Sequence, residues 1–155
     1  MKVEMYVDGA CSNNGHKDNF GGYSVIVVVD GAFYKEMHKG KRRTTNNEME
    51  LMGVLVAVRA AKQIEEEVTI YSDSAYVVNS INLWMDGWAA KGWVRGKGEP
   101  IKNLEIMKEL YELLNFNKLI KVAKIKGHVG HEFNEMADEY AVLAKTEEMH
   151  RYLNS

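Results

Sequence analysis

The chain of 155 residues contains one cysteine, Cys11, and one proline, Pro100. A single cysteine excludes an intramolecular disulfide, and sparse cysteine is typical of a protein from a reducing compartment. No apolar run reaches the roughly 18 residues that a membrane-spanning helix needs. The first residues, MKVEMYVDG, are too few and too charged for a signal peptide. We therefore expect a cytoplasmic protein without a membrane partner.

An excess of charge of one sign is also missing, because the formal net charge is -2. Bulk charge therefore does not indicate a nucleic-acid-binding protein. The hydrophobic fraction of 46% and the charged fraction of 27% are ordinary for a soluble globular protein. The length fits one domain with a single core. We expect one domain over residues 1–146, a C-terminal tail over 147–155, and a monomer.

The hydrophobic pattern predicts nine elements in the order β-β-β-α-β-α-α-β-α. This order indicates the α/β class, with a five-stranded mixed sheet flanked by helices. Asp30 and Gly31 predict a tight hairpin turn between the second and third strands. The predicted strands are 3–8, 22–30, 33–39, 68–73 and 119–126, and the predicted helices are 46–63, 74–86, 101–115 and 132–146.

One acidic residue is unexpected within the first long helix. The stretch NNEMELMGVLVAV, residues 46–58, is almost wholly apolar from Met49 onward, yet it contains Glu50. The neighbours of Glu50 on the same helix face are small or apolar, and an ionised carboxylate there is costly unless something pairs with it. By contrast, Glu48 is explained as part of a capping box with Thr45 as the N-cap.

Three further acids occupy positions that suggest a common site. Asp8 and Asp73 each end a predicted strand, and ligands of α/β sheets bind beyond the carboxyl ends of strands. Asp138, like Glu50, interrupts an apolar helix pattern. Clustered carboxylates repel each other unless cations neutralise them, and oxygen ligands favour Mg²⁺ or Mn²⁺. The alternative, that these acids are separate caps and surface charges, stays open because spacing does not prove convergence.

Seven segments together resemble the motifs of bacterial type I ribonuclease H, in the family's order and over nearly the whole chain. They are YVDGACSNNG (6–15), GGYSVIV (21–27), RTTNNEMELMG (43–53), YSDSAYV (71–77), GWAAKGWV (87–94), PIKN (100–103) and KGHVGHEFNEMADE (126–139). The resemblance implies an RNase H fold and hydrolysis of the RNA strand of RNA–DNA hybrids. It further implies two Mg²⁺ ions per site with substrate, Mn²⁺ as a possible substitute, and products with 5′-phosphate and 3′-hydroxyl ends.

The resemblance also assigns the catalytic residues. Its metal-binding acids fall on Asp8, Glu50, Asp73 and Asp138, and its mobile catalytic histidine falls on His128. His131 matches the second, structural histidine of the same motif. The remaining histidines match no motif and are interpreted as surface residues: His16, His38 and His150.

Substrate contacts are implied in the same way. Cys11, Asn14, Asn46 and Asn47 match positions that contact the minor groove, where RNA exposes its 2′-hydroxyl groups. Thr45 and Asn103 match the pocket for a phosphate of the DNA strand. A basic protrusion over about 84–98 supplies Trp88, Lys91 and Trp93. For Asn46 and Asn47 the alternative is capping of the first helical turn, and for Trp84 we expect docking of its helix on the core.

Three departures from the family pattern predict modest affinity for the hybrid. The segment after Asn14, residues 15–20, is longer than usual and lacks the family's proline. Ala75 replaces a glutamine that commonly contacts substrate, and Ala89 and Ala90 stand where basic residues are common. Two alternative functions stay open: the ribonuclease H domain of a reverse transcriptase, and a hybrid-binding module with weak catalysis.

Overall fold

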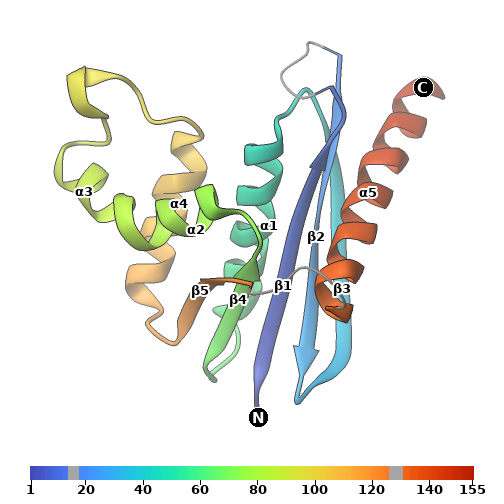
Figure 1. Cartoon of the computed structure of the whole chain (residues 1–155), viewed down its shortest axis with the longest axis horizontal. Coiled ribbons are helices and arrows are strands. Elements are labelled where there is room, and N and C mark those ends of the chain that lie inside the picture. Colours follow the sequence, from blue (N-terminus) through green and yellow to red (C-terminus); the bar gives the residue numbers. More distant parts are fainter. Residues whose placement is uncertain (14–17, 126–130) are drawn as a thin grey trace.

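Five strands form one mixed sheet in the order β3-β2-β1-β4-β5 in the computed structural model, which describes residues 1–13, 18–125 and 131–155 (Figure 1). The antiparallel pairs are β1 with β2 and β2 with β3, whereas β4 runs parallel to both β1 and β5. This arrangement confirms the predicted fold class. The strands are β1 (Val3–Cys11), β2 (Phe20–Val29), β3 (Ala32–Arg42), β4 (Val68–Ser72) and β5 (Ile120–Lys124).

Helices cover both faces of the sheet (Figure 1). The α1 side carries α1 (Asn46–Ala61) and α4 (Leu104–Phe116), while α5 (Glu132–Leu153) lies on the opposite face. No helix in the described ranges is long and apolar enough to cross a membrane. The shorter helical segments are α2 (Ala75–Asn79), the π-helical turn η1 (Ser80–Trp84), α3 (Met85–Ala90) and the 3₁₀ turn η2 (Gly96–Gly98).

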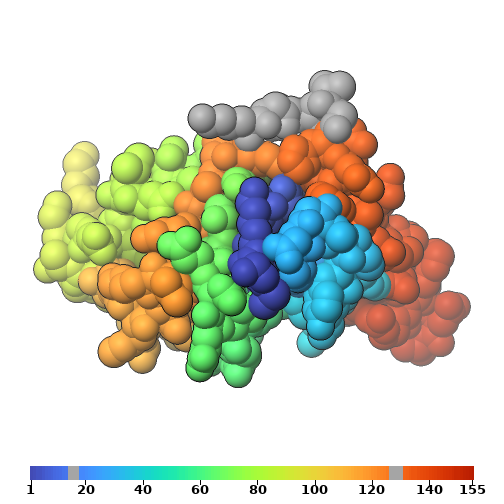
Figure 2. All heavy atoms as spheres, turned by 90° about the horizontal axis from the view of Figure 1, so that it is seen from below, coloured from blue at the N-terminus to red at the C-terminus, as the bar shows by residue number. Residues whose placement is uncertain are grey.

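Alternation along β1 divides the core into two parts. Met5 and Val7 pack into the larger cluster with α1, whereas Tyr6 between them packs with Ala137 of α5. Successive side chains of a strand point to opposite faces, so one strand serves both layers. Figure 2 shows the end of the molecule where β1 begins, in dark blue between the light-blue β2–β3 hairpin and the green region of β4. At this end the hairpin turns through Asp30 and Gly31, whose φ angles are 50° and 81°, as predicted.

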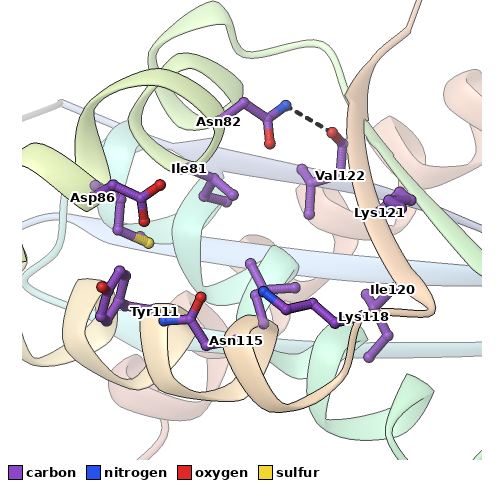
Figure 3. Close-up of a pocket in the computed structure, with 11 residues that line it drawn as sticks. Ile81, Asn82, Asp86, Tyr111, Asn115, Lys118, Ile120, Lys121 and Val122 are labelled. Atoms are coloured by element: carbon purple, nitrogen blue, oxygen red, sulfur yellow. Dashed lines mark hydrogen bonds between the residues drawn. The ribbon is translucent and has the colours of Figure 1, made fainter.

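The predicted helix over 74–86 is replaced by three short segments. The chain widens into the π-helical turn η1 between α2 and α3, and such turns interrupt the regular hydrogen-bond pattern of a helix. From η1, the Asn82 Nδ2 donates a hydrogen bond of 2.8 Å to the Val122 carbonyl on β5, the edge strand of the sheet (Figure 3). Occupying a carbonyl of an edge strand blunts its tendency to pair with another chain. Beside this bond lies a hollow of about 380 Å³ between η1, α4 and β5.

The predicted end of the last helix at residue 146 was wrong, because α5 continues to Leu153. Residues 147–153, expected as part of a tail, are held against the sheet. The Gly40 backbone on β3 lies so close to α5 that a Cβ there would be 2.6 Å from Glu148 Cβ. Further along, the Arg42 guanidinium lies 3.8 Å from the ring centroid of Tyr152. These contacts are long-range, so helical periodicity alone did not reveal them.

His38 on β3 was predicted as a surface residue, but it joins β3 to α5. Its Nδ1 lies 2.9 Å from Glu36 Oε2, and its Nε2 lies 2.8 Å from Glu147 Oε1. The ring also stacks on Tyr140 of α5 at 5.7 Å. Hydrogen bonding to Glu36, followed by that to Glu147, raises the pKa of His38 above its ordinary value. Through these two contacts and the stacking on Tyr140, the imidazole helps to fasten the last turns of α5 to the sheet edge.

Candidate active site

The strand register places two acids side by side. In the parallel pair of β1 and β4, Tyr6 lies opposite Tyr71. Continuing this register by two residues brings Asp8 beside Asp73, which directly follows β4. Neighbouring strands lie about 4.8 Å apart, a distance that carboxylate side chains span easily. The two acids predicted at strand ends therefore meet at one edge of the sheet.

A close approach of β1 and α1 brings in the third acid. A Cβ atom on Gly9 would lie 2.5 Å from the backbone nitrogen of Glu50 and 2.7 Å from the carbonyl carbon of Met49. Only glycine permits this distance. As a result, the first turns of α1 rest on the backbone of β1, and the Glu50 carboxylate faces the residue before Gly9, which is Asp8.

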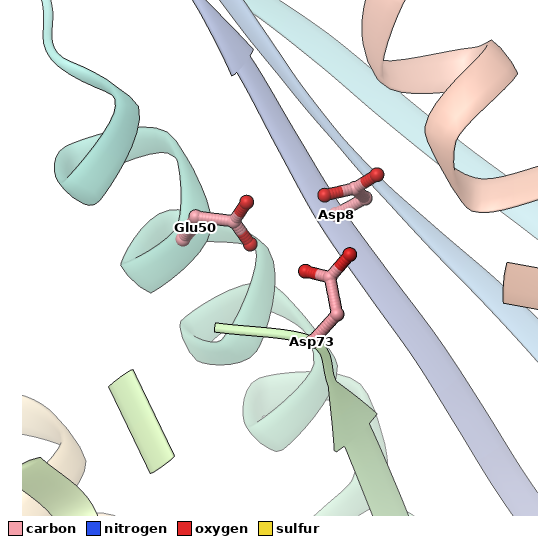
Figure 4. A group of neighbouring side chains, drawn as sticks. All are labelled: Asp8, Glu50 and Asp73. Atoms are coloured by element: carbon pink, nitrogen blue, oxygen red, sulfur yellow. The ribbon is translucent and has the colours of Figure 1, made fainter. Parts of the chain in front are cut away.

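The three carboxylates point toward one another from β1, α1 and the end of β4 (Figure 4). One oxygen of each of Asp8, Glu50 and Asp73 lies within 4.8 Å of the others. Asp8 is only 6% exposed, and Glu50 Oε2 is buried without a hydrogen-bond partner among the described residues. Burial, followed by the charge of Asp73, raises the pKa of Asp8, and burial and the charge of Asp8 raise the pKa of Glu50. The cluster therefore resists carrying all of its charges at neutral pH.

A divalent cation fits this donor set. Three carboxylates offer hard oxygen ligands, and the described part of the cluster includes no thiolate or imidazole that would favour a softer metal. The unpartnered Glu50 Oε2 is a buried acceptor that a cation would satisfy. These residues could hold a divalent metal ion.

Asp138 lies beside this cluster and not within it. The residue is exposed on α5, while its neighbour Ala137 is buried and accepts a hydrogen bond of 2.5 Å from Ser24 Oγ. Ser24 is the β2 partner of Asp8, so this bond fixes α5 next to the acids. The charge of Asp138 is near enough to contribute to the raised pKa of Asp8. Of the four predicted acids, three converge and the fourth lies next to them on the solvent side.

The two predicted histidines differ in what the structure describes. His128 lies outside the described residues, as does Asn14. His131 is the N-cap of α5, where its Nδ1 accepts a hydrogen bond of 3.4 Å from the Asn134 backbone N–H. Its ring lies 5.0 Å from that of Tyr6. This placement agrees with the structural role expected for His131.

The first turn of α1 carries three of the predicted substrate contacts. Thr45 is the N-cap, and its hydroxyl accepts a hydrogen bond of 3.1 Å from the Glu48 backbone N–H, as predicted. The carboxylate of Glu48 does not complete the expected capping box in the described contacts, because it bonds Thr44 Oγ1 and Lys41 Nζ. Asn46 and Asn47 follow Thr45 and are exposed at the helix N-terminus.

A hollow of about 540 Å³ joins this turn to the protrusion. Trp84, which we expected to dock its helix on the core, is instead 41% exposed and lies 6.0 Å from Trp88, measured between ring centroids. Trp93, expected to contact substrate, packs edge-on against Tyr111 at 5.4 Å. The lining comprises Asn47, Tyr76, Trp84, Trp88, Arg95, Ile101 and Lys102.

Two other predicted substrate residues lie around the same region. Asn103 directly follows Lys102, adopts a left-handed φ of 57° and precedes α4. Lys91 ends α3 and is exposed. Sequence reasoning missed Tyr76 and Lys102 as part of this hollow, because no local pattern shows which sides of separate helices face each other.

A profile of the RNase H family matches residues 1–146. The chain belongs to the RNase H family. It is 40% identical to the ribonuclease H of Clostridium botulinum strain Hall over 147 residues, which cover 94% of this chain and 97% of that protein. It is 42% identical over 144 residues to the ribonuclease H of Desulforamulus reducens, covering 92% and 87% of the two chains. As a member of this family, the chain is an endonuclease of the hydrolase class.

Solved structures of the family share the fold. LC9-RNase H1, a type 1 enzyme, matches with a TM-score of 0.79 at 32% identity and covers 94% of this chain and 72% of its own. The RNase H domain of prototype foamy virus matches with a TM-score of 0.81 at 24% identity, over 94% of each chain. LC11-RNase H1, solved in complex with an RNA/DNA hybrid, matches with a TM-score of 0.71 at 19% identity over 96% of this chain and 99% of its own. The latter two likenesses show the fold alone.

Proposed function

We propose that this chain cleaves the RNA strand of RNA–DNA hybrids and uses two Mg²⁺ ions, which Mn²⁺ can replace, at Asp8, Glu50, Asp73 and Asp138. The products would carry 5′-phosphate and 3′-hydroxyl ends. The observation that carries the proposal is the cluster of three carboxylates with one buried oxygen of Glu50 unpartnered. Such an arrangement is unfavourable without a cation, so its presence in the fold favours a metal-dependent function over a structural one.

The residues of the site have distinct parts in this chemistry. Asp8 is the most buried of the three clustered acids and faces both Glu50 and Asp73, so it would hold metal together with either of them. Asp138, exposed on α5, would complete the ligand set from the side that faces solvent. Bound divalent ions supply a nucleophilic water at neutral pH and stabilise the leaving oxygen of a phosphodiester. The carboxylates hold these ions and neutralise their charge.

Recognition of the hybrid would come from the surface beside the acids. Exposed amides at Asn46 and Asn47 can donate and accept hydrogen bonds together, which suits the 2′-hydroxyl groups of RNA. The hollow next to them combines Trp84 and Trp88 with the cations of Arg95 and Lys102. Aromatic rings and cations side by side are typical of surfaces that follow a nucleic-acid strand. The hybrid-bound structure of LC11-RNase H1, a protein with the same fold, supports this choice of substrate.

A cleavage assay on four labelled substrates tests the proposal: an RNA–DNA hybrid, an RNA duplex, a DNA duplex and single-stranded RNA, each with and without Mg²⁺. We expect cleavage of the hybrid alone, and only with metal. Asp8→Asn should lower the rate by roughly 10³-fold or more, because it removes a ligand of the metal ions that stabilise the transition state. This loss corresponds to about 4 kcal/mol, since each 1.36 kcal/mol is tenfold in rate. Hybrid binding should be retained, because the groove contacts lie elsewhere.

Glu67→Gln is the matched control for this variant. Glu67 is exposed in the turn before β4, and the change removes one carboxylate charge without touching the cluster. Its rate should equal that of the wild type. Cleavage near the wild-type rate in Asp8→Asn would overturn the metal assignment, whereas hybrid binding without cleavage in the wild type would favour the weakly catalytic binding module.

A further inference from the structure

Asn19 is a buried polar residue for which the catalytic site gives no explanation. It directly precedes β2 and is 0% exposed. We infer that Asn19 is a positioning residue for hybrid recognition, which fixes the end of β1 relative to the segment leading into α1. The inference rests on the proposed function, because these two segments carry the predicted minor-groove contacts.

The side-chain amide of Asn19 pairs with the backbone of Thr44. Its Nδ2 donates a hydrogen bond of 2.7 Å to the Thr44 carbonyl, and its Oδ1 accepts one of 2.9 Å from the Thr44 N–H. The backbone carbonyl of Asn19 also accepts a bond of 2.9 Å from the Arg43 N–H. The Asn19 side chain therefore bonds both backbone groups of Thr44, as a neighbouring strand would. Thr44 immediately precedes the N-cap Thr45.

The same amide reaches the end of β1. Its Nδ2 lies 3.2 Å from the Asn13 carbonyl oxygen and 3.4 Å from Cys11 Sγ. Cys11 Sγ in turn lies 3.6 Å from the Thr44 carbonyl oxygen. One buried side chain thus ties Cys11 and Asn13 to Thr44, although Cys11 and Thr44 are 33 residues apart in the sequence.

This tie sets the spacing of two groups of predicted substrate contacts. Cys11 lies at the end of β1, and Thr45, Asn46 and Asn47 begin α1, yet the sheet does not pair these segments with each other. Hydrogen-bond recognition requires donors and acceptors held to within about 0.5 Å. A desolvated amide with several partners provides such a constraint, because a lost bond leaves buried groups unsatisfied.

The acid cluster does not depend on this tie. Glu50 is held to β1 by the close backbone approach at Gly9, and the helix around it is anchored by the fully buried Met49 and Leu51. Loss of the Asn19 amide should therefore disturb the segment before α1 and leave the carboxylates in place. Hybrid affinity and selectivity should change much more than kcat.

Equilibrium binding in EDTA measures this effect without cleavage. The dissociation constants for an RNA–DNA hybrid and for a DNA duplex of the same sequence give a selectivity ratio for each variant. We expect Asn19→Ala to lower the ratio about tenfold, the size typical of a lost buried hydrogen bond. A folding defect would instead reduce the active fraction, which stoichiometric titration measures, and would leave the ratio unchanged. With Mg²⁺, KM for the hybrid should rise about tenfold while kcat changes by less than about threefold.

Ser12→Ala is the matched control. Ser12 Oγ bonds the Phe20 backbone at 3.2 and 3.3 Å, so it joins the end of β1 to the start of β2 next to Asn19 but does not reach Thr44. Its selectivity ratio should stay within about twofold of the wild type. An equal fall in Ser12→Ala and Asn19→Ala would show that general bracing matters and would overturn the specific role of the amide.

Asn19→Asp provides a second and independent readout. A carboxylate keeps the acceptor for the Thr44 N–H but loses the donor to the Thr44 carbonyl. Burial favours the neutral carboxylic acid, which can donate again. The selectivity ratio of Asn19→Asp should therefore recover toward that of the wild type as pH falls from 8 to 5, whereas that of Asn19→Ala should not.

The outcomes separate this inference from the proposed function. If the wild type does not prefer the hybrid over the DNA duplex, the proposed function fails. If the wild type prefers the hybrid and a folded Asn19→Ala keeps the same ratio, only the positioning role of Asn19 is wrong. Loss of folding in both Asn19 variants would make the residue a requirement of the fold and would also overturn the assignment.

Discussion

The acid cluster and the protrusion are held in place by different kinds of contact. In the acid cluster, Asp8 is 6% exposed and Gly9 lets α1 rest on the backbone of β1. The parallel register of β1 and β4 places Asp8 beside Asp73. The protrusion over 84–98 has one buried side chain, Met85, and its chain turns through left-handed residues such as Trp93 and Lys97. Long-range packing fixes the first region, whereas short turns and a few aromatic contacts shape the second.

From this difference we expect the two regions to tolerate different kinds of substitution. A catalytic cluster loses its chemistry when groups move by about 1 Å, so it is built on strands and a packed helix. Recognition of a nucleic-acid strand through its phosphates and bases depends on charge and stacking over a wide surface, so we expect single residues of the protrusion to vary more freely. Ala89 and Ala90 in the protrusion are consistent with this contrast. We expect substitutions in the two regions to separate catalysis from affinity.

The largest further effect should come from His128→Ala, which tests the catalytic side of the contrast. We expect turnover to fall by about 10²–10⁴-fold, the usual contribution of general acid–base help, with hybrid and metal affinity retained. His131→Ala is the control, because the loss of the α5 N-cap should lower stability by about 1 kcal/mol and leave turnover of the folded protein nearly unchanged. Steady-state kinetics and melting curves on both variants decide the assignment. Early melting with normal turnover in His128→Ala would reverse the two roles.

The protrusion should respond next, through Trp84. Trp84→Ala should weaken hybrid binding by about 1–3 kcal/mol, the usual contribution of a base-stacking aromatic, without a change in kcat. Trp93→Ala is matched in size but removes the contact with Tyr111, so it should lower the melting temperature more than the affinity. Titration calorimetry and thermal melts distinguish them. Equal binding losses would mean that Trp93 also faces the substrate.

A smaller effect concerns how the stability of the metal-free protein depends on pH through the acid cluster. Because the pKa values of Asp8 and Glu50 are raised in the folded state, the folded protein holds protons that the unfolded chain releases above about pH 4. The free energy of unfolding should therefore fall as pH rises through the window between the unfolded and folded pKa values. Mg²⁺ should raise the melting temperature more at pH 7 than at pH 4.

Asp73→Asn sharpens this prediction, because it removes the charge that helps to raise the pKa of Asp8. In EDTA at pH 7 the variant should be more stable than the wild type by about 1 kcal/mol, or about 2–4 °C in melting temperature. Glu67→Gln should show no such gain. A wild type that is at least as stable as Asp73→Asn would indicate that the acids do not repel each other in solution.

The smallest expected effect is a gain in affinity at the protrusion. Lysines at Ala89 and Ala90 should tighten hybrid binding several-fold at low salt, and each new phosphate contact should steepen the salt dependence by about 0.7–0.9 in log–log slope. A Phe33→Lys/Tyr34→Lys double variant adds the same two charges at the exposed edge strand β3 as a control for net charge. Unchanged affinity and slope in the Ala89/Ala90 variant would mean that this part of the protrusion does not approach the substrate.

Several features could be predicted from the sequence because their causes are local. Alternating apolar residues and β-branched residues predict the strands, and Asp30 and Gly31 predict the hairpin turn. Thr45 caps α1 because its hydroxyl accepts a hydrogen bond from the backbone N–H three residues further on. Glu50 was identified as unusual because its neighbours on the helix are apolar. The order of the elements, together with the motifs, was enough to predict the fold class and the family.

Other features depend on contacts between distant segments, which no local pattern encodes. Periodicity could not show that Asp8, Glu50 and Asp73 converge while Asp138 stays at the surface, since this depends on strand register and on the approach at Gly9. The extension of α5, the exposure of Trp84, the packing of Trp93 on Tyr111 and the buried amide of Asn19 have the same origin. Thus the sequence by itself determined most of the helices and strands and which side chains are ionisable. The tertiary structure decided which of those side chains are brought close together, because burial and long-range packing act only once the chain has folded.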